Sequence, residues 1–232
     1  VKFVDVVPPK HSLLLNVMRD QLDRFGEIDT TAKMLQHIAK ATTETVALNR
    51  EDPRVAAIAD EISLTPHYFG LAQALKPQFL SGDESGLESK EVDAEITLES
   101  FADDKATFFI DGKPITTTLK LRGIYNIFNA AAALTMTRAI MGDKINDKKL
   151  IASLSNIAPA FGRGETLTLH GQPVELVLVK NPSGFRLALQ SFSPKNYATM
   201  VAINDNYADG RDMSWLWDVN FESRSEERRV GK

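Results

Sequence analysis

Residues 44–71, ETVALNREDPRVAAIADEISLTPHYFGL, decide the fold class. Residues 44–49 form a short apolar run, which is typical of a buried strand. Residues 52–62 have the pattern of a helix with Pro53 in its first turn, and residues 65–71 indicate a further strand. Alternation of strand, helix and strand predicts a parallel sheet flanked by helices.

The same alternation extends toward the amino end. Residues 12–16 (SLLLN) form another short apolar run, and a polar, helix-compatible stretch follows it. Within that stretch apolar residues recur near helical spacing, at Ile28, Leu35 and Ile38. Asp29 or Thr30 is a candidate cap for this helix.

The pattern changes after Leu71. Residues 82–93 are polar and rich in Gly and Ser, which predicts an exposed loop. Residues 95–101 and 105–123 then indicate antiparallel strands with DGKP as a hairpin turn. Residues 125–142 predict a long helix closed by Gly142, and residues 146–157 predict a second helix.

A new β-α-β pattern occupies the last part of the chain. Residues 174–179 predict a buried strand, 181–192 a turn and helix, and 196–205 the next strand. A domain boundary is therefore expected near residues 161–164. The predicted fold class is α/β, with a parallel sheet, helices and antiparallel strands, followed by the start of a second α/β unit.

Composition excludes several classes of function. A net charge of -4 and a pI near 5.6 argue against a general nucleic-acid or anionic-lipid surface. The sequence has no Cys, so it offers no catalytic thiol and no thiolate metal site. Its four His residues have no metal-ligand spacing, and no apolar run suggests a signal peptide or membrane span.

Four places bring amides, carboxylates or Arg to the ends of predicted strands, where open α/β sheets bind ligands. They are residues 16–27, residues 123–129, the segment around Arg163, and residues 180–185. Asn126 and Asn129 share one helix face, although paired Asn at a helix start also fits a helix cap. The acidic stretch 204–222 fits an ordinary turn with buried Trp residues, or a turn in which one carboxylate does chemistry.

The order of these motifs resembles the Mur ligase superfamily of ATP-dependent amide-forming enzymes, and more closely its MurT-type subunits of lipid II isoglutaminyl synthase. The likeness is carried by NVMRDQLDRFGEID (16–29), NREDPRV (49–55), GIYNIFNAAA (123–132), FGRGE (161–165), KNPSGF (180–185) and INDNYADGRDMSWLWDVNFE (203–222). It implies the later part of a Mur-ligase central ATPase domain over 1–162 and the start of a Rossmann-like C-terminal domain over 163–222. Residues 223–232 are expected to be a disordered tail and resemble translated sequencing-adapter read-through.

The resemblance also implies a function. ATP, with Mg²⁺, would activate the α-carboxylate of D-glutamate in lipid II as an acyl phosphate. Ammonia from a glutaminase subunit of the GatD type would then give D-isoglutamine. The expected setting is a heterodimer in the cytoplasm, at the inner face of the membrane.

Each of these motifs corresponds to a family motif, and the resemblance therefore implies roles for individual residues. It implies adenine contact for Asn126 and Asn129, nucleotide contact for Arg163, and closure over the nucleotide for Lys180 and Asn181. Asn16, Asp20 and Gln21 match the stretch beside the metal and γ-phosphate, where most Mur ligases have His in place of this Gln. Asp212 matches the third member of a Cys-His-Asp triad whose Cys and His belong to the glutaminase, with Asp209 and Asp218 as alternatives.

Two departures from the family pattern bear on function. The four-cysteine zinc ribbon of many members cannot form without Cys. The phosphate-loop pattern G-x-x-x-x-G-K-S/T is also absent, so we expect a truncated chain without ATPase activity of its own. The alternatives are another Mur-type or folylpolyglutamate-type ligase that adds an amino acid, and a noncatalytic nucleotide-binding or scaffolding module.

Overall fold

The computed structural model describes residues 2–18, 28–78, 92–159, 162–179, 182–191, 198–203 and 219. In these ranges the amino-terminal part has the elements α1 (Lys2–Val6), β1 (His11–Leu14), α3 (Ile28–Ala41), β2 (Thr45–Asn49), α4 (Pro53–Ala56), η1 (Ala57–Glu61), β3 (His67–Leu71) and η2 (Lys76–Gln78). Next come β4 (Ile96–Ala102), β5 (Lys105–Ile110), β6 (Lys113–Thr118), α5 (Ile124–Met141), η3 (Gly142–Lys144), α6 (Asp147–Ser153) and η4 (Leu154–Asn156). The last elements are β7 (Arg163–Leu169), β8 (Gln172–Val177) and α7 (Pro182–Ser191).

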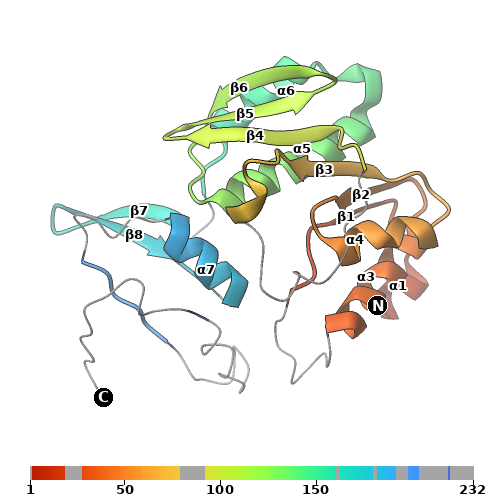
Figure 1. Cartoon of the computed structure of the whole chain (residues 1–232), viewed down its shortest axis with the longest axis horizontal. Coiled ribbons are helices and arrows are strands. Elements are labelled where there is room, and N and C mark those ends of the chain that lie inside the picture. Colours follow the sequence, from red (N-terminus) through yellow and green to blue (C-terminus); the bar gives the residue numbers. More distant parts are fainter. Residues whose placement is uncertain are drawn as a thin grey trace.

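A mixed sheet of six strands forms the centre of the molecule, in the order β1-β2-β3-β4-β5-β6 (Figure 1). β1 to β4 are parallel, and β4, β5 and β6 are antiparallel. The predicted α/β class and the antiparallel strands predicted within residues 95–123 are therefore confirmed. The β5–β6 turn is formed by Asp111 and Gly112, which both have positive φ (47° and 76°), as the DGKP pattern predicts.

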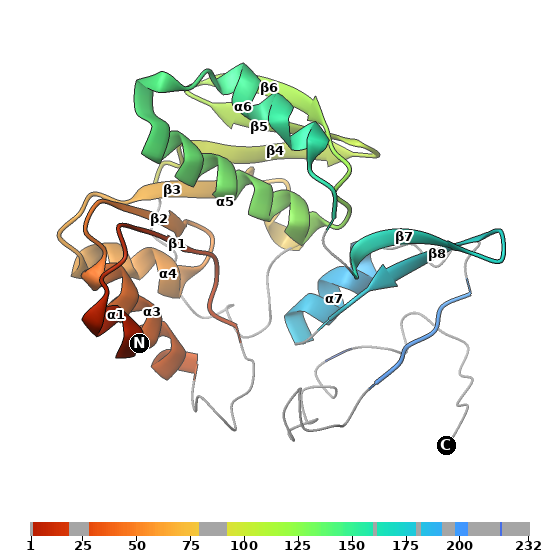
Figure 2. The same cartoon turned by 180° about the vertical axis from the view of Figure 1, so that it is seen from behind.

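Helices cover both faces of the parallel strands (Figure 2). One core joins β1, β2, α3, α4 and η1, and includes Leu14, Val46, Leu48, Val55 and Ile58. The other core lies between the sheet and the helices α5 and α6. In that core the rings of Phe69 from β3 and Phe128 from α5 have centroids 5.3 Å apart.

The sequence predictions for single elements mostly hold, but the cap predicted for α3 is an exception. α3 includes Ile28, so Asp29 and Thr30 lie in its first turn and neither is its cap. Asp29 instead pairs with Arg54 at 3.1 Å. Within the described residues, no helix is long and apolar enough to cross a membrane.

The carboxyl-terminal part differs from the predicted β-α-β pattern. β8 is only half-buried and pairs antiparallel with β7 in a separate two-stranded sheet. α7 follows as predicted, but residues 198–203 have no strand and are exposed, with Met200 88% exposed. The apolar side chains of Met200, Val201 and Ile203 are exposed, whereas a strand is stabilised by packing such side chains against its neighbours.

Candidate functional site

The carboxyl ends of β1, β2 and β3 meet at one edge of the sheet, because the three strands are parallel and adjacent. Open α/β sheets bind ligands at this edge. The predicted site residue Asn16 lies just past the end of β1, and its side chain is exposed. The edge therefore presents an accessible amide where the fold favours a ligand.

The loop that carries Asn16 is fixed on both sides by side chains from the end of β2 and from the turn that follows it. Asn49 donates from Nδ2 to the carbonyl oxygen of Leu15 at 2.7 Å. The amide of Val17 donates to Oδ2 of Asp52 at 2.5 Å. Asn49 is 5% exposed and Asp52 is 4% exposed. The main chain before and after Asn16 is thus tied to the end of β2.

Asp52 also begins the next helix. Its Oδ1 accepts the amides of Arg54 at 2.9 Å and Val55 at 3.0 Å, which makes it the N-cap of α4. Burial raises the pKa of this carboxyl above its ordinary value, although the three amide donors act in the opposite direction. Both oxygens of Asp52 are therefore committed to the main chain.

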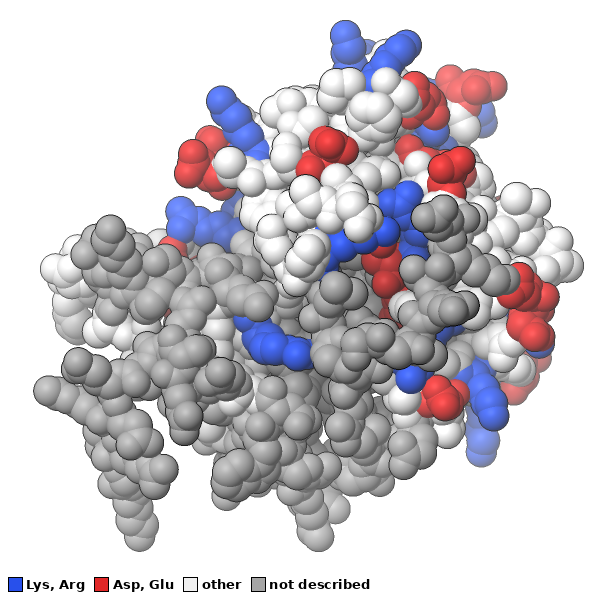
Figure 3. Space-filling view, in the orientation of Figure 1, with Lys and Arg blue, Asp and Glu red and all other residues white. Residues whose placement is uncertain are grey.

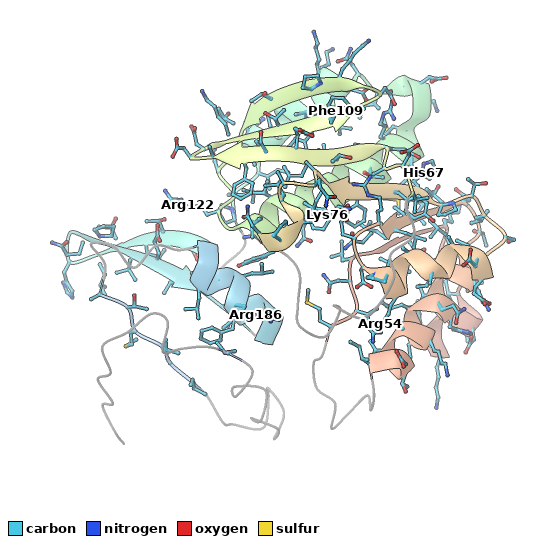
Figure 4. The ribbon with its side chains drawn as sticks, viewed as in Figure 1. Arg54, His67, Lys76, Phe109, Arg122 and Arg186 are labelled. Atoms are coloured by element: carbon cyan, nitrogen blue, oxygen red, sulfur yellow. The ribbon has the colours of Figure 1, made fainter. Side chains whose placement is uncertain are left out.

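A second network joins the ends of β2 and β3. Glu51 accepts from the amide of Leu71 at 2.9 Å and pairs with Lys76 at 3.1 Å. Arg50 donates to Glu51 at 2.8 Å and to the Leu71 carbonyl oxygen at 2.8 Å. In Figure 4, Lys76 lies near the middle of the molecule, on the short helix η2 that follows β3.

The first turn of α5 also lies at this edge, beside η2 in both views of the fold (Figures 1 and 2). Gly123, with φ of 83°, is its N-cap and makes no side-chain capping bond. Asn126 is half-buried and donates from Nδ2 to the carbonyl oxygen of Arg122 at 2.7 Å. Asn129 is exposed one turn further along. The alternative that the paired Asn residues cap the helix is therefore wrong.

The segment around Arg163 connects the central sheet to the β7–β8 hairpin. Gly162 and Gly164 flank Arg163 and have φ of 69° and 79°, a conformation that favours glycine. The amide of Gly162 donates to Glu165 at 3.1 Å. Arg163 begins β7 opposite Val177, and its side chain lies outside the described atoms.

An ion pair links the start of α5 to the hairpin. Arg122 and Glu175 on β8 approach to 2.6 Å. α5 also contacts α7, and the hairpin and α7 lie beyond the carboxyl ends of the parallel strands (Figures 1 and 2). The structure thus places Asn16, Asn126 and the Arg163 segment around one side of the sheet.

The remaining predicted site residues lie outside the described residues. They are Asp20, Gln21, Lys180, Asn181 and Asp212, together with the alternatives Asp209 and Asp218. Their predicted roles stay predictions.

The residues that build this edge had no role predicted from the sequence. Asn49, Arg50, Glu51 and Asp52 are consecutive, and each bonds to a neighbouring loop or strand. Two signals were available: these residues begin the motif NREDPRV, and they are four polar residues at the end of a buried strand, directly before Pro53, where side chains meet the neighbouring strand ends. Lys76 had no comparable signal, because η2 follows β3 without a recognisable motif.

The charged side chains at this edge pair with one another: Glu51 pairs with Arg50 and Lys76, and Arg54 pairs with Asp29. Within the described part of the chain, no three His, Cys, Asp or Glu residues are grouped as a metal site. The buried Asp52 carboxylate is fully used by three main-chain amides. On the face of the molecule seen in Figure 1, acidic and basic side chains are interspersed over the described surface (Figure 3).

Comparison with known families gives two matches in this chain. The Mur ligase middle domain matches residues 2–137, and the MurT ligase C-terminal domain matches residues 178–231. The earlier resemblance to MurT-type subunits is therefore confirmed.

Individual relatives agree with these matches. The MurT subunit of lipid II isoglutaminyl synthase (glutamine-hydrolyzing) from Streptococcus pneumoniae is 30% identical over 95% of this chain. A pseudomurein peptide ligase type C from Methanothermus fervidus superposes with a TM-score of 0.67 at 19% identity, over 84% of this chain and 43% of that one. MurF ligase from Thermotoga maritima, solved with ADP, gives a TM-score of 0.59 at 18% identity, over 82% of this chain and 40% of that one. The chain spans 56% of the length of the S. pneumoniae relative.

Proposed function

The chain belongs to the Mur ligase family, and from this premise we propose that it is part of the ligase subunit of a lipid II isoglutaminyl synthase. The observation that carries the proposal is the presence of two matches in one chain: a Mur ligase middle domain and, after it, a MurT ligase C-terminal domain. The first indicates a ligase, and the second supports a MurT-type subunit over a ligase that adds an amino acid. We propose the division expected from the sequence, into residues 1–162, 163–222 and a tail at 223–232.

The proposed reaction is amidation of the D-glutamate α-carboxylate in lipid II. A carboxylate is a poor electrophile, so transfer of the γ-phosphoryl group of ATP first converts it to an acyl phosphate. Ammonia then attacks the acyl carbon, phosphate leaves, and the amide of D-isoglutamine remains. Mg²⁺ bound to the phosphates would neutralise their charge, and phosphate oxygens and waters supply most ligands in such sites.

This chain's own residues would bind and orient the nucleotide. We assign Asn126 and Asn129 to the adenine end, Arg163 to the domain junction beside the nucleotide, and Asn16 and Asp20 to the phosphates. Lys180 and Asn181 would close over the bound nucleotide. The support for Asn16 and Asn126 is their position at the edge where β1 to β3 end and α5 begins.

Ammonia would come from a separate glutaminase subunit in a heterodimer at the cytoplasmic face of the membrane. We propose that Asp212 orients the catalytic His of that subunit. A carboxylate fixes the tautomer of the imidazole and stabilises its positive charge, as the third member of a triad does. Glutamine hydrolysis would then depend on assembly of the two subunits.

The test uses the full-length subunit with its glutaminase partner, lipid II and ATP. With glutamine as nitrogen source, we expect Asp212→Asn to lower D-isoglutamine formation by about 10²-fold or more, as loss of an orienting carboxylate does. With ammonium chloride the same variant should keep its rate, because free ammonia bypasses the triad. Mass spectrometry of the lipid II product measures both rates.

The controls are Asp209→Asn and Asp218→Asn. Loss of glutamine-driven activity in one of these, with Asp212→Asn unaffected, would move the triad role to that residue. A complex that couples an amino acid to the substrate and ignores both nitrogen sources would overturn the proposed function.

A further inference from the structure

The loop after β1 is held differently from an ordinary surface loop. Asn16 is exposed, but the residues on both sides of it are bonded to buried side chains. Asn49 holds the carbonyl oxygen of Leu15 from one side, and Asp52 holds the amide of Val17 from the other. We call Asn49 and Asp52 together the β1-loop clamp.

Each member of the clamp has one end anchored in its own turn. Asn49 accepts the amide of Glu51 on Oδ1 at 2.9 Å while its Nδ2 reaches Leu15. Asp52 accepts the α4 amides on Oδ1 while its Oδ2 reaches Val17. Because each side chain is fixed at both ends, the clamp sets the position of the Asn16 main chain relative to β2.

We propose that Asn49 and Asp52 are positioning residues. By fixing the main chain on both sides of Asn16, they hold the side-chain amide of Asn16 ready for the phosphates of the nucleotide. The proposal rests on the proposed function for the identity of the ligand, and on the structure for the clamp. A preorganised donor binds an oxyanion more tightly, since less conformational freedom is lost on binding.

Polarity, rather than shape, is what the clamp depends on. Asp52→Asn keeps an oxygen for the α4 amides, and Asn is as good an N-cap as Asp. Its new NH₂ group, however, faces the amide of Val17, so two donors meet. Asn49→Asp is the reverse change, since a carboxylate oxygen then faces the carbonyl oxygen of Leu15. Both variants are nearly isosteric with the native residue, and both release the loop.

A matched control is available at the other end of the same strand. Ser12 on β1 accepts a buried hydrogen bond from Thr42 at 2.8 Å. Ser12→Ala removes this bond without contacting the Asn16 loop. The variant therefore loses the stability that one buried hydrogen bond contributes, while the clamp stays intact.

The experiment measures binding of a non-hydrolysable ATP analogue, with Mg²⁺, to the full-length subunit. We expect Asp52→Asn and Asn49→Asp each to weaken binding by about tenfold, as small misplacements of a binding group do. Ser12→Ala should bind like the wild type. In the Asn16→Ala background, the clamp variants should cause little further loss, since the group that they position is gone.

Hydrogen exchange on the same proteins reports the clamp without the ligand. In Asp52→Asn the Val17 amide should exchange faster, while the amides of Arg54 and Val55 remain protected. Clamp variants that bind like Ser12→Ala, or losses that add fully to that of Asn16→Ala, would overturn the proposal. If the wild-type subunit binds no nucleotide, the proposed function fails together with the ligand assigned to Asn16, whereas the exchange result still tests the clamp separately.

Discussion

Gly70 shows how closely the side chains pack at the end of β3. A Cβ atom at this position would lie 2.6 Å from Nε and Nη2 of Arg50. The Arg50 guanidinium is bonded to Glu51, to the Leu71 carbonyl oxygen and to the Val92 carbonyl oxygen. Because these bonds fix it, Arg50 cannot move aside without losing them, and the position requires glycine.

We therefore predict that Gly70→Ala destabilises the protein by about 1–3 kcal/mol, the usual cost of overpacking. Urea unfolding measures the change in free energy. In the Arg50→Ala background the same substitution should cost far less, since the displaced group is absent. Equal costs in the two backgrounds would show that Arg50 is not what excludes a side chain at Gly70.

At the residue scale, the sequence predicted where a residue lies in its helix or strand better than it predicted which residues its side chain bonds to. Pro53 in the first turn of a helix was predicted and is confirmed. The Asp29 cap was wrong, because a charged residue near a helix start can equally pair with a neighbouring helix, here through Arg54. The bonds of Asn49 and Asp52 to the β1 loop could not be predicted, since they join residues 34 and 35 positions apart.

At the element scale, tight turns define the antiparallel hairpins. In the β5–β6 hairpin, Asp111 and Gly112 both take positive φ, and Ile110 pairs with Lys113 across the turn. His170 and Gly171 form the equivalent turn between β7 and β8, with φ of 50° and 78°. Arg138 on α5 pairs with both Asp111 and Asp147, which joins the first turn to the start of α6.

Gly112→Ala should destabilise the protein by about 1 kcal/mol, because a side chain disfavours the left-handed region. Nothing lies within 4 Å of the added Cβ, so the cost is purely one of backbone conformation. Gly112→Asn is the matched variant and should lose less, since Asn tolerates positive φ. Thermal unfolding measures both, and equal losses would contradict this account.

The order and type of most elements could be predicted, because apolar runs and turn residues are local signals. The Asp111–Gly112 turn and the long helix ending at Gly142 are examples. The strand predicted at residues 196–205 failed over its described part, 198–203. An apolar run becomes a strand only when a neighbour pairs with it, and the run itself does not specify that neighbour.

At the scale of the whole molecule, the β7–β8 hairpin is joined to the rest partly through charge. Arg122 precedes α5, and Glu175 lies in β8, 53 positions further along the chain. Figure 4 shows Arg122 on the side of the sheet that faces the hairpin. Arg122 is more than half exposed, so solvent weakens the pair.

Reversal of one charge should cost about 0.5 kcal/mol, the scale of exposed ion pairs, because two like charges then meet. We predict this for Arg122→Glu and for Glu175→Arg, and recovery in the double variant that exchanges the two charges. Urea unfolding at low salt measures the cycle. Failure of the double variant to recover would show that the pair does not couple the two parts.

The prediction of the candidate site rested on the order of its motifs more than on any single motif. Asn16 and Asn126 were predicted, and the structure places both on the side of the sheet where β1 to β3 end. The pairing of β8 with β7, and not with a later strand, was missed because register and neighbour are set by tertiary contacts.

The order of the central sheet also affects self-association. In the described part of the chain, β1 and β6 are the outermost strands of this sheet. An unpaired strand edge can recruit another copy of the protein and start aggregation. β6 begins with Lys113 and Pro114, a charged residue and one without an amide donor, and β1 has only four residues. Both edges thus have features that oppose the addition of a foreign strand.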